Sequence, residues 1–335
     1  MNITTLKKPA ERADWLAVRR HYICPSDFGV ALGLSPFRTP YQLYLEKTGR
    51  QIEDREPTEG MLFGIYAEKY CADRYSEMTG RTVRNFGYML IDEEHHICGD
   101  VDRLVVPEGA SIAAWRGDVR TDRVLECKTT RIPWIEGEIP AFYQAQGLGY
   151  LYLADAAVID FSVLFFNPRV EWRPFSIERD EGRVQDTADW AKEWFERHVI
   201  GDTPPPAICE ADCRAMWAQS RGVEVKATPA NMADITELRA LDEQITALEK
   251  REEEARTRIF SAMGEADTLV DPETGKKLAT WKSNKDSSRT DWNAVCSDIA
   301  GMGLPSEIRT KINVSIEEHT ITRPGARTFR LAKAG

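Results

Sequence analysis

The segment that most constrains the fold runs from residue 122 to residue 166, where the pattern changes from strand to helix and back. "DRVLECKTT", 122–130, and "AAVIDFSVLFF", 156–166, are apolar runs typical of buried strands. "AFYQAQGLGYLYLA", 141–154, lies between them and has the length and composition of a helix. This alternation predicts an α/β core in which helices flank a central mixed sheet.

The chain continues the same alternation on both sides of this segment. The expected helices cover residues 11–22, 39–49, 59–80 and 180–200, and the expected strands cover residues 83–92 and 95–106. Because helices and strands are interspersed rather than separated into blocks, they are expected to share one core.

The prolines of "GDTPPPAICEADC", 201–213, mark the clearest domain boundary. We expect a core over residues 1–205, a proline-containing linker over 206–230, and a C-terminal extension over 231–335 with a basic tail. Pro and polar residues gather where few contacts cross between domains, which is why the boundary is placed there.

The extension has a different character from the core. From Leu238 onward its apolar residues recur at close to heptad spacing, which predicts a long amphipathic helix. That helix could form a coiled-coil arm or pack on its own domain, since short heptad matches also occur in ordinary helices. A hairpin over 266–284, a short helix near 290–300 and a basic strand over 323–333 are expected to follow. The fold class is therefore an α/β core plus a C-terminal helical and β-hairpin extension.

Composition narrows the class of protein. No apolar run of about 18 residues is present, so no transmembrane helix is expected, and the N-terminus lacks the apolar region of a secretory signal. The seven cysteines are scattered, which suits reduced thiols in the cytoplasm. Cys209 and Cys213 are four residues apart, but no second pair completes a zinc site.

The net charge of −10 argues against a nucleic-acid partner, but the distribution of charge is uneven. Residues 1–50 carry eight Lys and Arg against four Asp and Glu, and residues 276–335 carry eleven against six. A basic periphery around an acidic centre suits a metal-dependent nuclease, in which cations hold phosphates and carboxylates hold metal.

Glu126 and Lys128 lie two residues apart in the strand over 122–130, so both side chains point to the same face. One interpretation is a structural ion pair at a sheet edge. The other is a metal ligand beside a catalytic lysine. The two residues alone do not decide between these interpretations.

Glu68 is an acidic residue on the apolar stripe of the helix over 59–80. It is separated by a helical period from Met61, Ile65, Ala72 and Tyr75, which predicts an inward position. A buried carboxylate is costly unless it is paired or bound to a cation. Glu68 is therefore expected to meet an arginine or to bind a metal.

Asp100 and Asp102 share one face of the strand over 95–106. Two like charges so close together repel each other unless something positive lies between them, or unless they form an exposed turn. Together with Glu68, Glu126 and Lys128, Asp102 makes a set of three carboxylates and one lysine. Hard oxygen ligands of this kind suit Mg²⁺ or Mn²⁺, and a lysine beside them could orient or deprotonate water.

The order of these motifs resembles the PD-(D/E)xK nuclease superfamily, whose restriction-endonuclease-like core is an α/β fold. "WLAVRRHYICPSDFGVALGLSPFRTPYQLYLEKTG", 15–49, resembles the opening of the YqaJ-type viral recombinases, the family of phage lambda exonuclease. "GIYAEKYCADRYSEMTG", 64–80, and "YQAQGLGYLYL", 143–153, are similar to two helices of that family. The resemblance covers residue 15 to about residue 170.

This resemblance implies a two-metal 5′→3′ exonuclease that digests one strand of linear double-stranded DNA. The 3′ overhang left behind would serve a single-strand annealing protein in phage recombination. Asp102 and Glu126 would be the central Mg²⁺ ligands, with Mn²⁺ as a possible substitute, and the backbone carbonyl of Cys127 would be another ligand. Glu68 would serve the second metal, and Lys128 would act on the nucleophilic water.

Gln146 would position that water or the lysine. It shares an apolar stripe with Phe142, Tyr150 and Leu153, which fits an inward role, although a packed core glutamine has the same pattern. Gln144 is a rival two residues earlier.

The resemblance implies that Arg19 and Ser26 bind a terminal 5′-phosphate, with Arg20 as an alternative to Arg19. A guanidinium and a hydroxyl suit a phosphate monoester. Where the family often has a small hydroxyl residue, this chain has Asp100. That acid could repel the phosphate or bind metal itself. The insertion over 107–122 is also longer than a tight hairpin needs.

Two other functions are compatible with the residues. One is a RecB-like nuclease acting on single strands, whose relatives carry an iron–sulfur cluster. The other is a non-catalytic DNA-binding module that recruits partners through the heptad helix. The family precedent also implies a homo-oligomer in the form of a trimeric ring, no membrane partner, and a phage or prophage protein in the bacterial cytoplasm.

Overall fold

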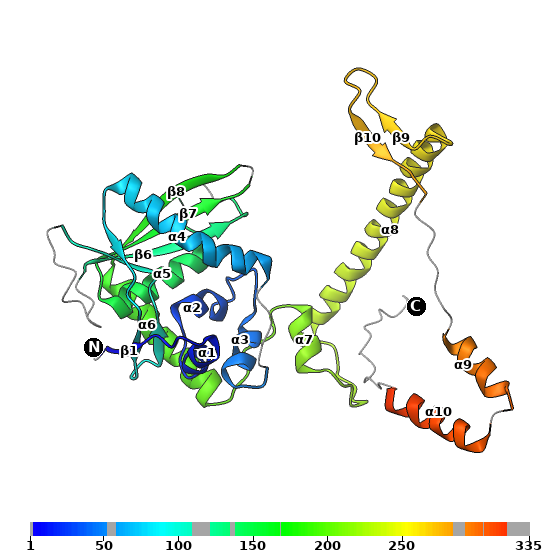
Figure 1. Cartoon of the computed structure of the whole chain (residues 1–335), viewed down its shortest axis with the longest axis horizontal. Helices are drawn as coiled ribbons and strands as arrows, with labels where there is room; N and C mark the ends of the chain where they lie inside the picture. Colours follow the sequence, from blue (N-terminus) through cyan, green and yellow to red (C-terminus); the bar gives the residue numbers. More distant parts are fainter. Residues whose placement is uncertain are drawn as a thin grey trace. The chain divides into compact units, whose positions relative to one another are not determined.

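The computed structural model describes residues 3–51, 58–108, 121–134, 138–167, 169–283, 292–303 and 305–319. The chain divides into two units, Met1–Trp217 and Ala218–Gly335. Figure 1 shows the elements of both units along the sequence. The first unit contains the candidate site.

The first unit is built on a five-stranded sheet with the order β2-β5-β6-β7-β8. The strands are β2 (Val83–Arg84), β5 (Arg103–Val105), β6 (Arg123–Thr130), β7 (Val158–Phe165) and β8 (Glu171–Glu178). β6 and β7 run parallel, and the other neighbouring pairs are antiparallel. The sheet is therefore mixed, which confirms the predicted α/β core with a central mixed sheet.

The helix α5 (Ala141–Ala154) connects β6 to β7, as parallel neighbours require. Its bounds are those expected from the sequence. Almost all of its residues from Ala145 onward are buried, because the helix packs between the sheet and other helices. Two glycines allow that close packing: a Cβ on Gly29 would lie 2.6 Å from that of Phe142, and one on Gly149 would lie 2.7 Å from the ring of Phe28.

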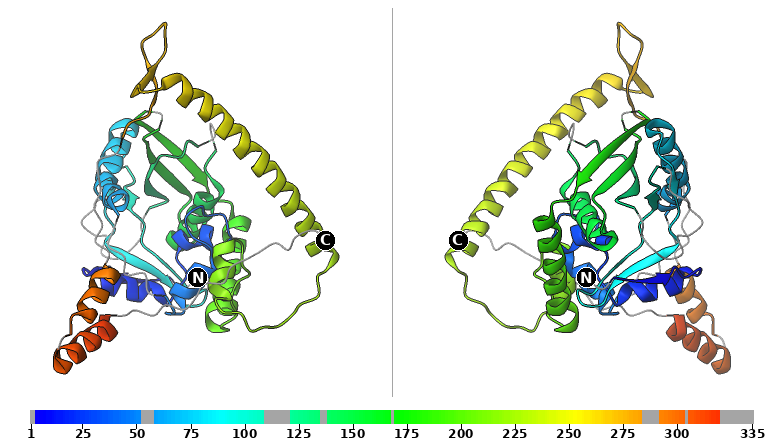
Figure 2. Two further views of the ribbon diagram at one scale, coloured as in Figure 1. Left: turned by 90° about the vertical axis from the view of Figure 1, so that its right-hand side faces the viewer. Right: turned by 90° about the vertical axis from the view of Figure 1, so that its left-hand side faces the viewer.

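The helix α4 (Glu59–Thr79) covers the opposite face of the sheet from α5. Thr58 caps its first turn, and Gly80 ends it with a φ of 71°. Tyr75 of α4 packs with Leu125, while the neighbouring residue Val124 belongs to the core around α5. Alternate residues of β6 thus face different helices. In Figure 2, α4 stands to one side of the strands in both views.

A second, three-stranded antiparallel sheet completes the first unit. It has the order β1-β3-β4, from β1 (Thr4–Lys7), β3 (Tyr88–Asp92) and β4 (Ile97–Gly99). The sequence patterns did not predict β1 as a strand. They also did not predict β8, which carries Pro174 and several exposed charges as an edge strand can.

Three helices lie near the N-terminus; the first two pack on this sheet, and the third packs on the second helix. They are α1 (Arg12–Arg20), α2 (Pro25–Ala31) and α3 (Pro40–Lys47). α1 and α3 were expected, whereas α2 was not. Pro25 lies at the first turn of α2, where a missing N–H is harmless.

The first unit ends with α6 (Glu181–Phe195), a π-helical turn, η2 (Glu196–Ile200), and α7 (Glu210–Met216). Asp212 of α7 ties this segment to the core. It accepts a hydrogen bond from the Thr39 hydroxyl at 2.7 Å and one from the Ile208 N–H at 3.1 Å. The structure therefore places α7, within the expected linker, on the first unit.

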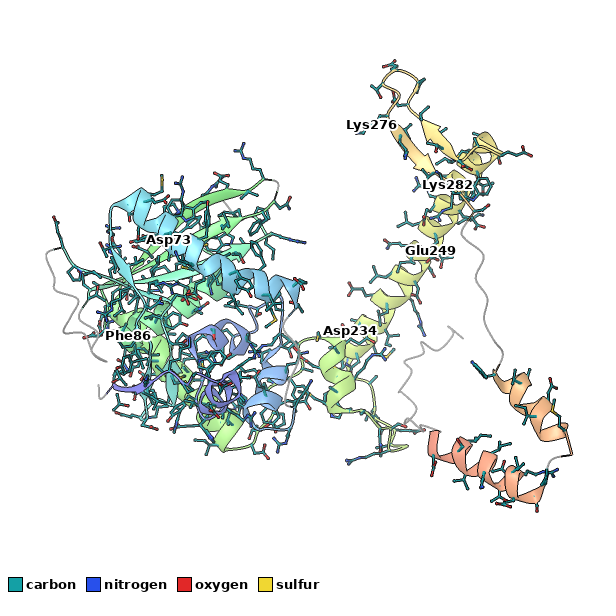
Figure 3. All side chains as sticks on the ribbon, viewed as in Figure 1. Asp73, Phe86, Asp234, Glu249, Lys276 and Lys282 are labelled. Atoms are coloured by element: carbon teal, nitrogen blue, oxygen red, sulfur yellow. The ribbon has the colours of Figure 1, made fainter. Side chains whose placement is uncertain are left out.

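The second unit begins after Trp217 and contains α8 (Pro229–Met263), the hairpin strands β9 (Thr268–Val270) and β10 (Lys277–Thr280), α9 (Trp292–Gly301) and α10 (Ser306–His319). The rings of Phe260 and Trp281 stack at 4.4 Å and join the hairpin to the end of α8. Figure 3 labels Asp234 and Glu249 along α8, and Lys276 and Lys282 at the hairpin.

Several sequence expectations concern residues beyond those described. The basic strand expected over 323–333 and most of the insertion over 107–122 lie outside the described residues. Every cysteine whose side chain the structure describes is a free thiol. No helix in the described part of the chain combines the length and the apolar character needed to cross a membrane.

Candidate active site

Glu126 is the centre of a buried polar group on β6. Its Oε1 accepts hydrogen bonds from the Lys128 ammonium at 2.8 Å and from the Gln146 amide at 2.7 Å. Glu126 is only 4% exposed, and Gln146 is buried with it. Gln144 points elsewhere, because its amide donates to the carbonyl of Ile139 at 2.7 Å. Of the two glutamines considered, Gln146 is therefore the one beside the glutamate.

The second oxygen of Glu126 has no partner. Among the described residues, Oε2 is buried and receives no hydrogen bond. Leaving a buried carboxylate oxygen unsatisfied costs about 1–3 kcal/mol or more, so natural proteins usually supply a donor, a water or a cation. This unsatisfied oxygen fits a metal ligand better than it fits a structural ion pair.

Asp102 lies beside this group, just before β5. Its Oδ2 accepts the backbone N–H of Cys127 at 2.8 Å, which connects β5 to β6 at this point. Burial raises the pKa of the Asp102 carboxyl well above its usual range, and repulsion from Glu126 and Glu68 raises it further. Burial likewise raises the pKa of Glu126, although the Lys128 charge opposes this. A divalent cation would relieve both penalties, so the donor set fits Mg²⁺ or Mn²⁺.

Glu68 projects from α4 toward the same region. Its carboxylate forms an ion pair with Arg103, whose guanidinium also donates to the backbone carbonyl of Asp102 at 2.6 Å. The prediction that the apolar stripe of this helix faces inward is wrong for its N-terminal half, because Met61 and Ile65 are 49% and 58% exposed. The residues of α4 that are buried all lie from Ala67 onward, so Glu68 stands at the edge of the buried stripe.

Each of the three carboxylates has a protein partner in this structure. No group of three or more His, Cys, Asp or Glu side chains in the described part of the chain has the spacing of a formed metal site. Lys128 contacts Glu126, Arg103 contacts Glu68, and the Cys127 N–H donates to Asp102.

Arg19 and Ser26 form a second polar group, contributed by α1 and α2. The Arg19 guanidinium donates to the Ser26 hydroxyl at 2.8 Å and stacks over the Trp15 ring at 4.4 Å from its centre. Asp100 lies on the other side, with its Oδ1 3.8 Å from Arg19, and it also forms an ion pair with Lys8. Asp100 thus contacts Arg19 and Lys8 directly, and its charge also contributes to the raised pKa of Glu126.

One cleft of about 390 Å³ connects the two polar groups. Arg19 and Ser26 line it together with Lys128 and Gln146. Arg20, the alternative to Arg19, does not line this cleft. The structure therefore places the expected phosphate-binding pair and the expected catalytic lysine around the same space.

A buried ion pair between Lys47 and Asp27 contacts the backbone of Arg19. The Lys47 ammonium lies 2.8 Å from Asp27 and also donates to the backbone carbonyl of Arg19 at 2.9 Å. Arg38 binds the other oxygen of Asp27 at 3.1 Å. Sequence patterns did not predict these residues as part of the site. The contacts link residues far apart in the chain, and nothing in the local pattern indicates them.

Lys8 and Arg103 are two further residues near the site that the sequence analysis missed. Lys8 follows the short strand β1, and its partner Asp100 is 92 residues away. Arg103 directly follows Asp102, so its proximity to the site could have been expected from the sequence.

These features define a mixed α/β domain with a buried carboxylate–lysine group next to a cationic cleft. Residues 14–157 match the YqaJ-like viral recombinase domain. This part of the chain is therefore similar to the YqaJ-like viral recombinase domain.

One curated protein is similar to this chain over most of its length. The chain is 28% identical to the YqaJ protein of Bacillus subtilis (strain 168) over 283 residues, which covers 81% of this chain and 83% of that protein.

Solved structures show weaker likenesses. An alkaline exonuclease from Laribacter hongkongensis has 17% identity and a TM-score of 0.39, covering 57% of this chain and 100% of that one. A phage-related exonuclease from Haemophilus somnus 129PT has 12% identity and a TM-score of 0.37, covering 54% and 96%.

Proposed function

We propose that this protein is a metal-dependent 5′→3′ exonuclease that acts on linear double-stranded DNA and leaves 3′ single-stranded overhangs for phage-type homologous recombination. The observation that carries the proposal is the buried, unsatisfied Oε2 of Glu126 beside Asp102, Lys128 and Gln146. A site with this composition is costly to the fold, and such costs are usually retained for chemistry. The YqaJ-like recombinase domain supports a role in recombination.

The carboxylates of Asp102 and Glu126 and the backbone carbonyl of Cys127 would hold Mg²⁺, and Glu68 would hold a second ion. When bound, Mg²⁺ supplies a Lewis acid that lowers the pKa of water and offsets charge on the scissile phosphate. Glu68 could take this role once its ion pair with Arg103 opens. Mn²⁺ has similar ligand preferences and could substitute.

Lys128 serves the attacking water as a cation. Burial alone would lower the pKa of its ammonium, but attraction to Glu126 and Asp102 outweighs burial, and the pKa is raised. As a cation, Lys128 would orient the water and stabilise negative charge on the phosphate. Gln146 holds Glu126 in place through its amide hydrogen bond.

Arg19 and Ser26 bind the terminal 5′-phosphate at the other end of the cleft. A guanidinium already fixed by stacking and by a hydroxyl contact loses little freedom on binding an anion. Because Arg19, Ser26 and Lys128 line the same cleft, the scissile bond would lie close to the chain end, and we therefore propose that 5′-mononucleotides are released.

Digestion of end-labelled linear duplexes tests the proposal. Duplexes labelled at the 5′ or the 3′ end are incubated with Mg²⁺ or with EDTA, and the products are resolved over time. We expect labelled mononucleotide to appear first from the 5′ end, in Mg²⁺ alone. Release from the 3′ end, or digestion in EDTA, would refute the proposed polarity or the metal requirement.

The proposed partners follow from the proposed activity. Double-stranded DNA ends are the substrate, a single-strand annealing protein receives the overhang, and the active form is a homo-oligomer, with a trimeric ring as the family precedent. The proposed location is the cytoplasm of the bacterial host.

A further inference from the structure

A row of aromatic rings forms one wall of the cleft, and we name it the aromatic wall: Tyr143, Phe142 and Phe37. The Lys128 ammonium lies 5.1 Å from the centre of the Tyr143 ring. The Tyr143 and Phe142 rings are 4.1 Å apart, and Phe142 meets Phe37 edge to face at 6.4 Å and 85°. The wall thus leads from the catalytic lysine to an outer ring at Phe37.

Phe37 differs from the other two rings because it is 71% exposed. Tyr143 and Phe142 are partly covered, and α5 holds them in place where Gly29 of α2 allows close approach. A single exposed phenylalanine is common on a protein surface. Phe37, however, lines a cleft together with the cationic side chains of Arg19 and Lys128, so its exposed ring is available to an anionic ligand bound there.

The position of Phe37 is fixed by its neighbours. Its backbone N–H donates to the Ser35 hydroxyl at 3.2 Å, and the next residue, Arg38, is held by Asp27 and Glu46. The segment between α2 and α3 therefore presents the ring at a defined place. A pre-positioned ring binds a flat ligand with less loss of conformational entropy than a mobile one.

Cationic side chains also line the cleft, among them Arg19 and Lys128. Arg19 has one face on Trp15 and a hydrogen bond to Ser26, so it is directed toward the cleft. The Trp15 ring is occupied by that guanidinium. Among the aromatic side chains that line the cleft, Phe37 thus presents the most exposed ring to a ligand.

We infer that the cleft binds the 5′-terminal nucleotide of the substrate, a deoxynucleoside 5′-monophosphate unit, with its base stacked on Phe37. This inference rests on the proposed function, since it identifies how the same site holds the chain end. The 5′-phosphate lies at Arg19 and Ser26, the 3′-phosphate lies at Lys128, and the base leaves the cleft toward Phe37. A volume of about 390 Å³ is within the range of small-ligand pockets.

Stacking on an aromatic ring has a specific consequence for base preference. Every base has a flat π face, so the contact tolerates all sequences, and larger bases gain more from it. Phe37 therefore acts as a binding residue for the terminal base without selecting one base by hydrogen bonds. Terminal purines are held more tightly than terminal pyrimidines.

The test compares binding of two ligands to the full-length protein by isothermal titration calorimetry in Mg²⁺. The ligands are dAMP and 2-deoxyribose 5-phosphate, which differ by the base alone. We expect dAMP to bind more tightly to the wild type, and Phe37→Ala to weaken dAMP binding about fivefold or more, the lower range for base–aromatic stacking. Binding of 2-deoxyribose 5-phosphate stays within about twofold. Phe37→Trp retains the preference for dAMP.

Two variants serve as controls. Phe63→Ala removes an exposed phenylalanine on α4 that does not line the cleft, and it leaves both affinities unchanged. Arg19→Ala weakens both ligands equally, because both carry the phosphate. If the wild type binds the two ligands equally, or if Phe37→Ala leaves the affinity for dAMP unchanged, the inference is wrong.

This experiment is separable from the proposed nuclease activity. dAMP contains no phosphodiester bond, so its binding does not depend on cleavage. A protein that binds dAMP through Phe37 but does not digest duplex DNA would keep this inference and refute the nuclease. A protein that digests duplex DNA but binds dAMP without any contribution from Phe37 would keep the proposed nuclease activity and refute this inference.

Discussion

Asp100 lies 3.8 Å from the guanidinium of Arg19 and forms an ion pair with Lys8 as well. An acidic side chain thus occupies one side of the arginine that we propose as the phosphate ligand. The two cations and the carboxylate together carry one net positive charge, where the cations alone would carry two. The strength of the proposed phosphate contact should therefore depend on Asp100, and the ion pair with Lys8 would remain available to this carboxylate when a phosphate binds.

Asp100→Asn is expected to increase the preference for 5′-phosphorylated ends over 5′-hydroxyl ends. Removing one partly screened negative charge should favour the phosphate by about 1 kcal/mol, which is roughly fivefold in kcat/KM. The ratio of kcat/KM for the two ends measures this effect. Asp100→Glu keeps the charge and should keep the wild-type ratio. An unchanged ratio in Asp100→Asn would show that the carboxylate does not influence the end pocket.

Asp102→Asn, Glu126→Gln and Lys128→Ala are expected to abolish or nearly abolish digestion of linear duplex DNA. The first two remove a proposed metal ligand, and Lys128→Ala removes a stabilising cation, for which a loss of about a hundredfold or more is expected. Circular dichroism should show that the fold persists. Digestion at the wild-type rate by any of the three would contradict the assignment of the site.

Mg²⁺ is expected to stabilise the wild-type protein against heat. An ion at about a hundredfold excess over its dissociation constant contributes about 2.7 kcal/mol, or about 5–10 °C for a domain of this size. Asp102→Asn should lose this shift, because it removes a proposed ligand. Asp73→Asn, which changes an exposed acid of α4 paired with Lys69, should keep it. Differential scanning calorimetry with and without Mg²⁺ provides the measurement, and an equal shift in both variants would count against the site.

The buried pair of Asp27 and Lys47 is expected to make stability depend on pH. Burial alone would raise the pKa of Asp27, but attraction to Lys47, Arg19 and Arg38 outweighs it, and the folded-state pKa is lowered. A carboxyl group with a lowered pKa stabilises the fold above its unfolded-state value of about 3.9, and that stabilisation is lost as the pH falls below it.

Asp27→Asn should therefore cost about 3–5 kcal/mol at pH 7, because it leaves the Lys47 charge buried without its partner. The difference from the wild type should shrink as the pH falls from about 4 toward the lowered pKa. Urea unfolding at several pH values measures it. A difference that stays constant with pH would mean that the carboxylate charge does not stabilise the fold.

Gly29→Ala is expected to destabilise the protein because the new Cβ would lie 2.6–2.9 Å from Phe142, partly against its backbone. Overpacking of this kind costs about 1–3 kcal/mol. Gly60→Ala provides a matched control in α4. Its Cβ would lie 3.9 Å from the Thr58 hydroxyl, so the substitution should instead stabilise the helix by about 0.5–1 kcal/mol. Thermal unfolding of both variants measures the contrast, and equal effects would contradict the close packing of α2 on α5.

The sequence by itself determined the elements with strong local patterns. The strand over 122–130 and the helix over 141–154 were recognisable because side-chain direction in a strand or helix repeats over a few residues. The same local rule predicts that Glu126 and Lys128 share a face, and the structure confirms it. The same periodicity did not predict β8, because its exposed charged residues and Pro174 interrupt the apolar alternation expected of a strand.

Only the tertiary structure decided which side chains meet across long separations in the chain. From the sequence, Asp100 could have belonged to the proposed metal group or to the proposed phosphate pocket; in the structure its direct contacts are with Lys8 and Arg19. The unsatisfied oxygen of Glu126 and the position of Phe37 on the cleft likewise depend on how β6, α5 and the α2–α3 segment pack. Local periodicity tells which way a side chain points, whereas the partner that it meets depends on packing between distant segments.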